Sequence, residues 1–123
     1  MTSGGAGTKL NHVVNSRTEA LDRTFAALSD PTRRGLLAAL SHGARTVGDL
    51  AAPLPISLVA VTKHLAVLER AGLVERTRRG RRVVCTLRGR PLHEAAGWLE
   101  HYRAFWDERL DSLETFLSRE GPA

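Results

Sequence analysis

Two prolines, Pro53 and Pro55, constrain the middle of this chain more than any other residues do. Proline lacks a backbone donor and its ring clashes with the preceding helical turn, so a helix cannot continue through this stretch. Upstream, Thr46 and Asp49 have the spacing of a capping box. The sequence therefore predicts a short helix that runs to Ala52 and a turn at the two prolines.

A second helix is predicted directly after this turn. Ser57 is a good N-cap, and the helix it starts extends to Arg70. Val61, Leu65 and Leu68 recur at helical spacing and form its inward stripe. Together the two helices predict a helix-turn-helix.

Two more helices are predicted before the helix-turn-helix. The first begins at Thr18, and its apolar residues recur three or four positions apart: Leu21, Phe25 and Leu28. Asp30 and Pro31 are suited to the N-cap and first position of the next helix, which ends near Gly43. Residues 1–17 are rich in Gly, Ser, Thr and Asn and are expected to form a flexible tail.

A β-hairpin is predicted after the helix-turn-helix. The segments 73–79 and 82–87 alternate in character, and Gly80 between them can adopt the positive φ of a tight turn. Such a hairpin is a wing. The predicted fold is therefore mainly α with a small β-hairpin wing, a winged helix-turn-helix of about five helices in a domain spanning 18–118.

One long amphipathic helix is predicted over about 91–118. Its main apolar residues occur in steps of three or four: Leu92, Ala95, Leu99, Tyr102, Trp106, Leu110, Leu113 and Leu117. Trp98, Phe105 and Phe116 widen this face beyond what a small domain covers. Exposed aromatic surface of this kind usually marks an interface, and we expect a second copy of the chain to cover it.

The charge of the chain is basic and unevenly distributed. The net charge is +5 and the basic residues are sixteen Arg and two Lys. The segment 70–90 holds eight Arg and one acid, whereas 91–120 holds seven acids and three Arg. We therefore expect the first of these segments to bind a polyanion, and duplex DNA is the expected partner.

Several other classes of protein are not expected. One Cys cannot form an internal disulfide or a thiolate cluster, and no stretch has the character of a signal peptide or membrane span, so a cytoplasmic location without membrane contact is predicted. Phosphate-binding loops, nucleophile elbows and paired metal-binding His are absent from the sequence. An enzyme is therefore not predicted, and no cofactor is expected.

Five residues of the second helix of the helix-turn-helix are the candidates for reading the major groove: Ser57, Val59, Thr62, Lys63 and His64. Leu58 and Val59 can contact thymine methyl groups, while Thr62 and Lys63 can bond bases or phosphates. Two alternatives stay open at this point. Ser57 can act only as a cap and Thr62 can be merely solvated, and His64 can bond either to a phosphate or within the fold.

Four Arg at the tip of the wing are the candidates for the DNA backbone or minor groove: Arg78, Arg79, Arg81 and Arg82. The alternative is a solvated basic hairpin. Arg33 is a weaker candidate for a phosphate contact. Its neighbour Arg34 is spaced for a local ion pair with Asp30.

These residues occur in strings that resemble the ArsR family of winged-helix repressors. The most specific strings are Leu-Ser-Asp-Pro-Thr-Arg at 28–33, Thr-Lys-His-Leu at 62–65 and Leu-Glu-Arg-Ala-Gly-Leu-Val at 68–74. The resemblance implies a homodimer joined through the first and last helices, and repression that an inducer, here an unknown small molecule, relieves. The interface residues expected are Leu21, Phe25, Leu99, Tyr102, Trp106, Leu110 and Leu113.

The resemblance also raises the question of metal sensing. Val47 to Ala52 contains no Cys-x-Cys motif, and His93 and His101 do not fit the family's pattern in the last helix, so no metal residue is predicted. A novel site that combines His93 and His101 with Glu94 or Glu100 across a dimer stays an alternative. Cys85 lies on the inward face of the wing and is interpreted as a buried structural thiol rather than a sensor.

The sequence thus predicts a dimeric repressor that binds an inverted-repeat operator and does not respond to metal through the known sites. Two alternatives remain. One is a metal-responsive repressor with a non-standard site. The other is a winged-helix interaction module that no longer binds DNA.

Overall fold

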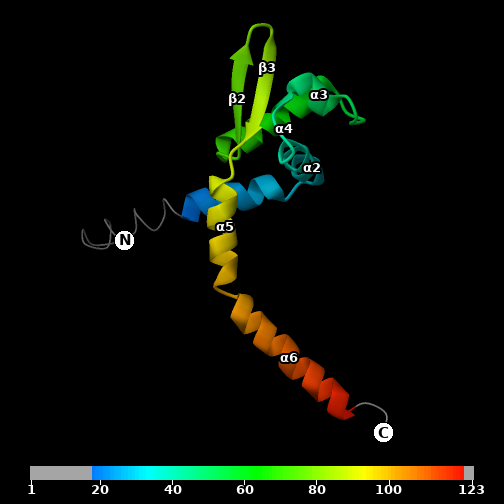
Figure 1. Ribbon diagram of the computed structural model, residues 1–123, viewed down its shortest axis with the longest axis vertical. Coiled ribbons are helices and arrows are strands. Elements are labelled where there is room, and N and C mark those ends of the chain that lie inside the picture. The colour runs from blue at the N-terminus through cyan, green and yellow to red at the C-terminus, as the bar shows by residue number, and fades with distance from the viewer. Residues whose placement is uncertain (1–17, 121–123) are drawn as a thin grey trace, which may run out of the picture.

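The computed structural model describes residues 18–120, so the tail predicted over 1–17 lies outside the described residues (Figure 1). A first helix covers 18–28. The elements after it are α2 (Pro31–Leu40), β1 (Arg45–Thr46), α3 (Val47–Ala51), α4 (Leu58–Arg70), β2 (Val74–Arg79), β3 (Arg82–Leu87), α5 (Arg90–Glu100) and α6 (Arg103–Glu120). The prediction of a winged helix-turn-helix is confirmed.

Three helices begin at the caps that the sequence predicted. Each cap side chain accepts a hydrogen bond from the backbone N–H three residues later: Asp30 from Arg33 at 3.0 Å, Thr46 from Asp49 at 3.1 Å, and Ser57 from Ala60 at 3.1 Å. These bonds satisfy donors that a helix start leaves without a partner. The starts of α2, α3 and α4 are therefore fixed by local chemistry.

The core forms around the inward stripe of α4. Val61, Leu65 and Leu68 are fully buried, as the spacing predicted. They pack in one cluster with residues of α2, α3 and the sheet: Leu36, Leu37, Leu40, Leu50, Leu73, Val74 and Cys85.

The first helix turns a different face to this core than its sequence suggested. Thr24 and Ala27 are its buried residues, and the Thr24 hydroxyl donates to the carbonyl of Ala20 at 3.1 Å. Leu21 and Phe25 are only partly buried. Small residues therefore make the close contact, and the larger ones lie at its margin.

The wing belongs to a three-stranded antiparallel sheet of order β1-β3-β2. The sequence did not predict β1, which has only two residues and pairs Arg45 with Cys85. In the hairpin, Arg79 pairs with Arg82, and Gly80 has a φ of +63° in the two-residue turn. The predicted turn at Gly80 is confirmed.

The single long helix predicted over 91–118 is wrong, because α5 and α6 are separated by a turn at His101 and Tyr102. The amides of these two residues donate to carbonyls three positions back, those of Trp98 and Leu99, at 3.3 and 3.0 Å. This tighter pattern ends α5, and no Gly or Pro marks the position. The break raises the number of helices in residues 18–120 from the expected five or so to six.

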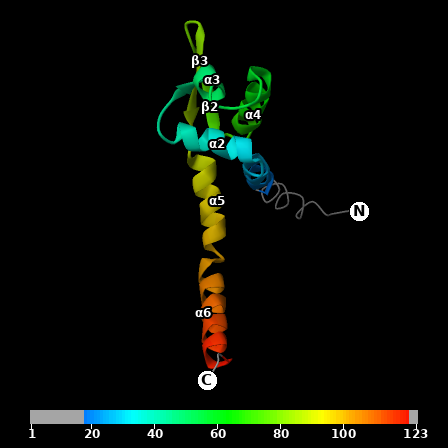
Figure 2. The same cartoon turned by 90° about the vertical axis from the view of Figure 1, so that its right-hand side faces the viewer.

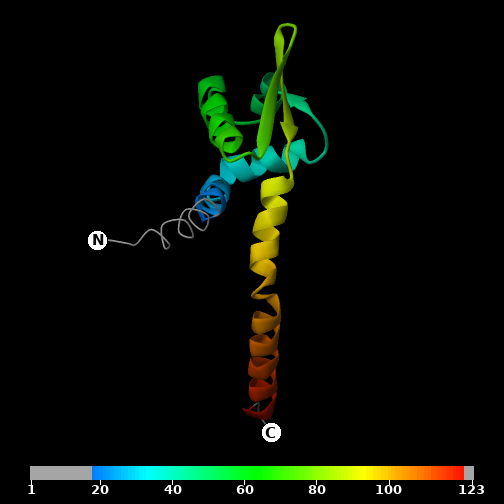
Figure 3. The same cartoon turned by 90° about the vertical axis from the view of Figure 1, so that its left-hand side faces the viewer.

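The molecule has the wing at one end and two extended helices at the other. The wing and the helix-turn-helix lie at one end, and α5 and α6 extend away from them (Figure 1). Views turned by 90° show α4 beside the wing, and α5 and α6 arranged end to end (Figures 2 and 3). None of the helices described combines the length and apolar character needed to cross a bilayer.

The end of α4 sets the direction in which the wing starts. Gly72 adopts a φ of +77°. Its amide donates to the backbone carbonyl of Glu69, and the amide of Leu73 donates to the backbone carbonyl of Leu68, each at 2.9 Å. This pair of bonds is a Schellman motif, which terminates the helix and turns the chain into β2.

Gly72→Ala should destabilise the protein by about 1–2 kcal/mol, because a Cβ disfavours the left-handed conformation. A Cβ at this position would meet its nearest neighbour, Pro91, at an ordinary 3.5 Å, so the cost arises from the backbone. Gly35→Ala is the control. Gly35 lies within α2, and a methyl group there would have no neighbour within 4 Å, so this change should raise stability by up to about 1 kcal/mol. Urea unfolding measures both changes in stability, and an equal change in the free energy of unfolding for the two variants would contradict this explanation.

Candidate nucleic-acid interface

The outward face of α4 is apolar at its start and basic further along. Leu58 and Val59 are 56% and 64% exposed, and Lys63 is also exposed. Burial of Val61 and Leu65 fixes this orientation, because residues on the opposite side of a helix must face solvent. The face can therefore offer methyl groups and an ammonium group to a ligand.

Ser57 and Thr62 already have partners within α4. The Ser57 oxygen accepts from the amide of Ala60, and the Thr62 hydroxyl donates to the carbonyl of Leu58 at 2.9 Å. Ser57 thus keeps a hydroxyl hydrogen to donate, whereas Thr62 keeps only acceptor capacity. The cap role of Ser57 is confirmed, and contact with DNA stays a prediction.

The four Arg at the tip of the wing are all exposed: Arg78, Arg79, Arg81 and Arg82. Within the described residues none of them forms an ion pair, and Arg78 donates only to the carbonyl of Gly80 at 3.3 Å. Arg79 and Arg82 are direct cross-strand partners. Like charges placed opposite each other repel, so the tip would be stabilised by a bound anion.

A hollow of about 580 Å³ lies between α4 and the wing. Its lining comes from three places, the start of α3, the start of α4 and the wing: Thr46, Val47, Gly48, Asp49, Leu58, Thr62, Arg76, Arg81, Arg82 and Val83. Arg76 is paired with Glu69 at 2.7 Å, while Arg81 and Arg82 have no such partner in the described part of the chain. The hollow therefore brings two free guanidinium groups beside the outward face of α4.

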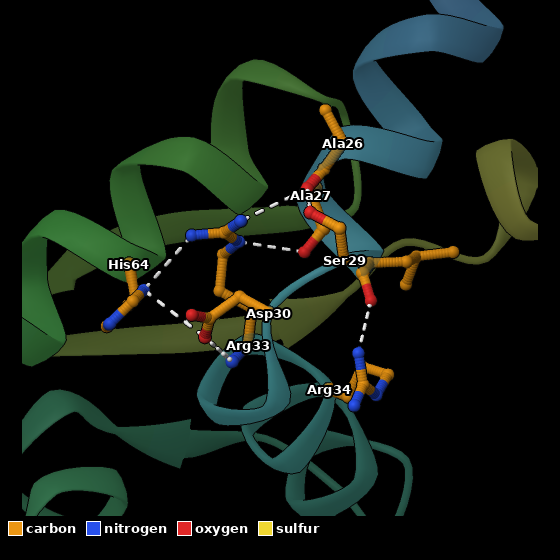
Figure 4. A network of polar contacts seen from close by, with 8 residues as sticks. Ala26, Ala27, Ser29, Asp30, Arg33, Arg34 and His64 are labelled. Carbon is orange, nitrogen blue, oxygen red and sulfur yellow. Dashed lines mark hydrogen bonds and ion pairs between the residues drawn. The ribbon is translucent and has the colours of Figure 1, made fainter.

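The guanidinium group of Arg33 is bonded within the protein. Its Nε donates to the carbonyl of Ala27 at 2.7 Å, its Nη2 to that of Ala26 at 3.0 Å, and its Nη1 lies 3.3 Å from Nδ1 of His64 (Figure 4). All three guanidinium nitrogens thus have partners within the protein. These bonds leave two of its five N–H donors, so the weak prediction of a phosphate contact stays a prediction.

The local ion pair for which Asp30 and Arg34 are spaced does not form. Arg34 donates instead to the carbonyl of Leu28 at 2.8 Å. The Asp30 carboxylate lies 3.8 Å from Nδ1 of His64 and caps α2 (Figure 4). The hydrogen bond from the amide of Arg33, reinforced by the charge of Arg33, lowers the pKa of Asp30 below its ordinary value.

Cys85 is fully buried in the sheet, as predicted for a structural thiol. Burial raises its pKa, although the charge of Arg76 acts in the opposite direction. The thiolate is the reactive form of cysteine, so this environment suppresses reactivity.

The last two helices carry an apolar face that the rest of the described chain leaves largely exposed. Its exposed members are Trp98, Leu99, Tyr102, Phe105, Trp106, Leu110, Leu113, Phe116 and Leu117. The ring of Trp98 packs edge-on against that of Phe25 in the first helix, with 5.8 Å between the ring centroids. The centroid of the Tyr102 ring lies 5.3 Å from that of Trp98. Two of the expected interface residues, Phe25 and Tyr102, thus meet on Trp98.

Within one copy of the chain, the residues of the alternative metal site do not form a cluster. His93, Glu94, Glu100 and His101 are exposed along α5 and the turn after it. In residues 18–120 no group of three or more His, Cys, Asp or Glu side chains is arranged to hold a metal ion.

Two parts of the site were not predicted from the sequence: the contact of Arg33 with His64 and the pairing of Arg76 with Glu69. The first joins residues 31 positions apart, and no local pattern marks it. The second links α4 to β2, and only the assembled sheet brings its charges together.

The capping carboxylate of Asp30 should make stability depend on pH in a specific direction. Because its folded pKa is lowered, its contribution is present above the unfolded pKa and is lost as pH falls below about 4 through the folded pKa. Asp30→Asn keeps a good cap without the charge. The difference in melting temperature between wild type and this variant should favour wild type at neutral pH and shrink on acidification. A difference that does not change with pH would contradict the assignment.

Comparison with known proteins agrees with this geometry. Residues 28–77 match a family model described as a helix-turn-helix domain. The HTH-type transcriptional regulator Rv2034 of Mycobacterium tuberculosis is 38% identical over 100 residues, covering 81% of this chain and 91% of that protein. The transcriptional repressor SdpR of Bacillus subtilis is 32% identical over 82 residues, covering 67% of this chain and 91% of that protein.

Solved structures show the same relationship. An ArsR-like transcriptional regulator from Rhodococcus superposes with a TM-score of 0.65 at 37% identity, covering 82% of this chain and 95% of that one. A crystal structure of an ArsR family transcriptional regulator gives a TM-score of 0.67 at 35% identity, with 72% and 97% covered. The winged helix-turn-helix DNA-binding domain of Mb0332 from Mycobacterium bovis, described as homodimeric, superposes with a TM-score of 0.59 at 26% identity. The match covers 80% of this chain and 88% of that one. The chain belongs to the ArsR family of winged helix-turn-helix proteins and is a DNA-binding transcriptional regulator.

Proposed function

We propose that the protein is a dimeric repressor that binds an inverted-repeat operator with α4 in the major groove and the wing on the flanking backbone or minor groove. The observation that carries this proposal is the hollow between α4 and the wing, where Arg81 and Arg82 lie beside Leu58 and Thr62 without an acidic partner among residues 18–120. A phosphate backbone running between two grooves would lie in this hollow.

The roles of the residues follow from their chemistry. Val59 can contact a thymine methyl, Lys63 can bond guanine or phosphate, and Thr62 can accept from the amino group of adenine or cytosine. Ser57 has a hydroxyl hydrogen left for a phosphate. The four wing Arg can enter a narrow minor groove, whose negative potential attracts guanidinium groups. Repulsion between Arg79 and Arg82 would be relieved in that complex.

Dimerisation would use the apolar face of α5 and α6 together with the margin of the first helix. Leu99, Trp106 and Leu110 are each more than half exposed in the single chain, which is costly for large apolar groups. A second copy supplies a matching face by two-fold symmetry. Half-site centres would then lie about 10 bp apart or a multiple of that distance.

Two alternatives make different predictions. A metal-responsive repressor would be purified with bound metal in the absence of chelator, and metal would change its affinity for DNA. An interaction module without DNA binding would show no steep loss of affinity for duplex DNA as salt is raised. The exposed Leu58 and Val59 favour this second alternative. The Arg residues at the tip of the wing, which form no ion pair within the described residues, favour DNA.

Variants of the wing and of α4 should weaken DNA binding in different ways. Arg79→Ala with Arg81→Ala should weaken binding to every duplex and reduce the slope of log affinity against log salt by about 1 for each lost phosphate contact. Lys63→Ala should also change which sequence is preferred. Fluorescence anisotropy with specific and scrambled duplexes at several salt concentrations measures both effects. Indistinguishable behaviour of the two sets would contradict the assigned roles.

Disruption of the apolar face should produce a monomer that binds operator DNA poorly. Trp106→Glu and Leu110→Glu place charge where each side chain is 58% exposed in the single chain and would be buried in the dimer. Glu114→Gln, an exposed change on the same helix, is the control. Sedimentation should show a dimer for wild type and the control and a monomer for the first two variants. If the Trp106→Glu and Leu110→Glu variants are also dimers, the dimer interface lies elsewhere.

A further inference from the structure

The contact between Arg33 and His64 connects the start of α2 to the middle of α4. The carbonyls of Ala26 and Ala27 hold the guanidinium from one side, at 3.0 and 2.7 Å. With two of its nitrogens held in this way, the group is fixed in place while Nη1 approaches Nδ1 of His64 at 3.3 Å. The geometry is that of a donor directed at one nitrogen of the ring (Figure 4).

This contact determines which ring nitrogen carries the proton. A guanidinium group can only donate, so Nδ1 of His64 must offer its lone pair. In neutral imidazole the proton is then on Nε2. The Asp30 carboxylate favours the opposite arrangement, but it lies 3.8 Å from Nδ1, beyond hydrogen-bonding distance, and already accepts from the Arg33 amide at 3.0 Å.

The other nitrogen of the ring faces away from this network. Figure 4 shows Nε2 of His64 directed away from Asp30 and Arg33, and the side chain is 25% exposed. His64 and Thr62 lie about 160° apart around the axis of α4, given about 100° per residue. Thr62 lines the hollow beside the wing, so His64 lies on the opposite flank. A helix in the major groove has a phosphate backbone along each flank.

We infer that Arg33 is a positioning residue for DNA binding, which holds His64 with its proton on Nε2 and so presents an N–H donor to a backbone phosphate on the α2 side of the groove. The inference rests on the proposed function, because it needs α4 in the groove. It gives Arg33 an indirect role in place of a direct phosphate contact. The positive charge of Arg33 offsets the negative charge of Asp30 beside the ring, so this flank of α4 does not repel the phosphate.

A pair of amide variants separates the two edges of the ring. The amide of Asn ends two bonds from Cβ, at the level of Nδ1, and that of Gln ends three bonds away, at the level of Nε2. His64→Asn therefore keeps an acceptor for Arg33 and loses the outward donor, while His64→Gln keeps the outward donor. With full-length protein and a duplex that wild type binds, His64→Asn should bind about tenfold more weakly and His64→Gln close to wild type.

Arg33→Lys tests the positioning role. In the wild-type background it should weaken binding several-fold, because the tautomer is no longer fixed. In the His64→Gln background it should cost little, because an amide has no tautomer for Arg33 to fix and can turn its NH2 group toward a phosphate. Nitrogen-15 NMR of the His64 ring should show the Nε2–H form in wild type and a mixture in Arg33→Lys. Urea unfolding of each variant separates loss of binding from loss of fold.

The outcomes distinguish this inference from the proposed function. If wild type binds no duplex, the proposed function fails. If wild type binds and the two His64 variants bind equally, or Asn binds better than Gln, the donor role is wrong. If Arg33→Lys weakens binding equally in both backgrounds, Arg33 acts through the fold and not through the ring.

Discussion

Burial of one side of α4 is the constraint on which the rest of the molecule depends. Val61, Leu65 and Leu68 are fully buried, and burying such side chains contributes about 1.5 to 3 kcal/mol each. The same stripe that joins α2, α3 and the sheet into one core also decides which residues of α4 face outward. Stability and the proposed recognition of DNA would therefore use opposite sides of one helix. A rotation of α4 that exposed Lys63 less would also expose Leu65.

The second constraint is the separation of charge and apolar surface between the two ends. At the wing, Arg79 and Arg82 are placed opposite each other without an acidic partner in the described residues. At the other end, α5 and α6 carry seven of the thirteen acidic residues and a broad apolar face. Neither surface is favourable in an isolated chain, since like charges repel and large apolar groups are exposed. A polyanion at one end and a second copy at the other would resolve both.

Sequence patterns predicted the features that depend on neighbouring residues. The caps at Asp30 and Ser57 each follow from a bond that spans three positions, and the turn at Gly80 follows from the conformational freedom of glycine. Features that depend on the assembled fold were not predicted. The contact of Arg33 with His64 forms only when α2 packs on α4, and β1 exists only because β3 lies beside it. The break before α6 has no breaker residue, and its i to i−3 bonds leave the apolar periodicity intact.

The most direct test of the central claim is selection of bound sequences from a random duplex library by the full-length protein at about 150 mM salt, where electrostatic binding without specificity is weakened. A dimeric repressor should enrich an inverted repeat whose half-site centres are separated by about 10 bp or a multiple of that. A folded dimer that enriches no sequence would contradict the claim, and the winged helix would then be an interaction module.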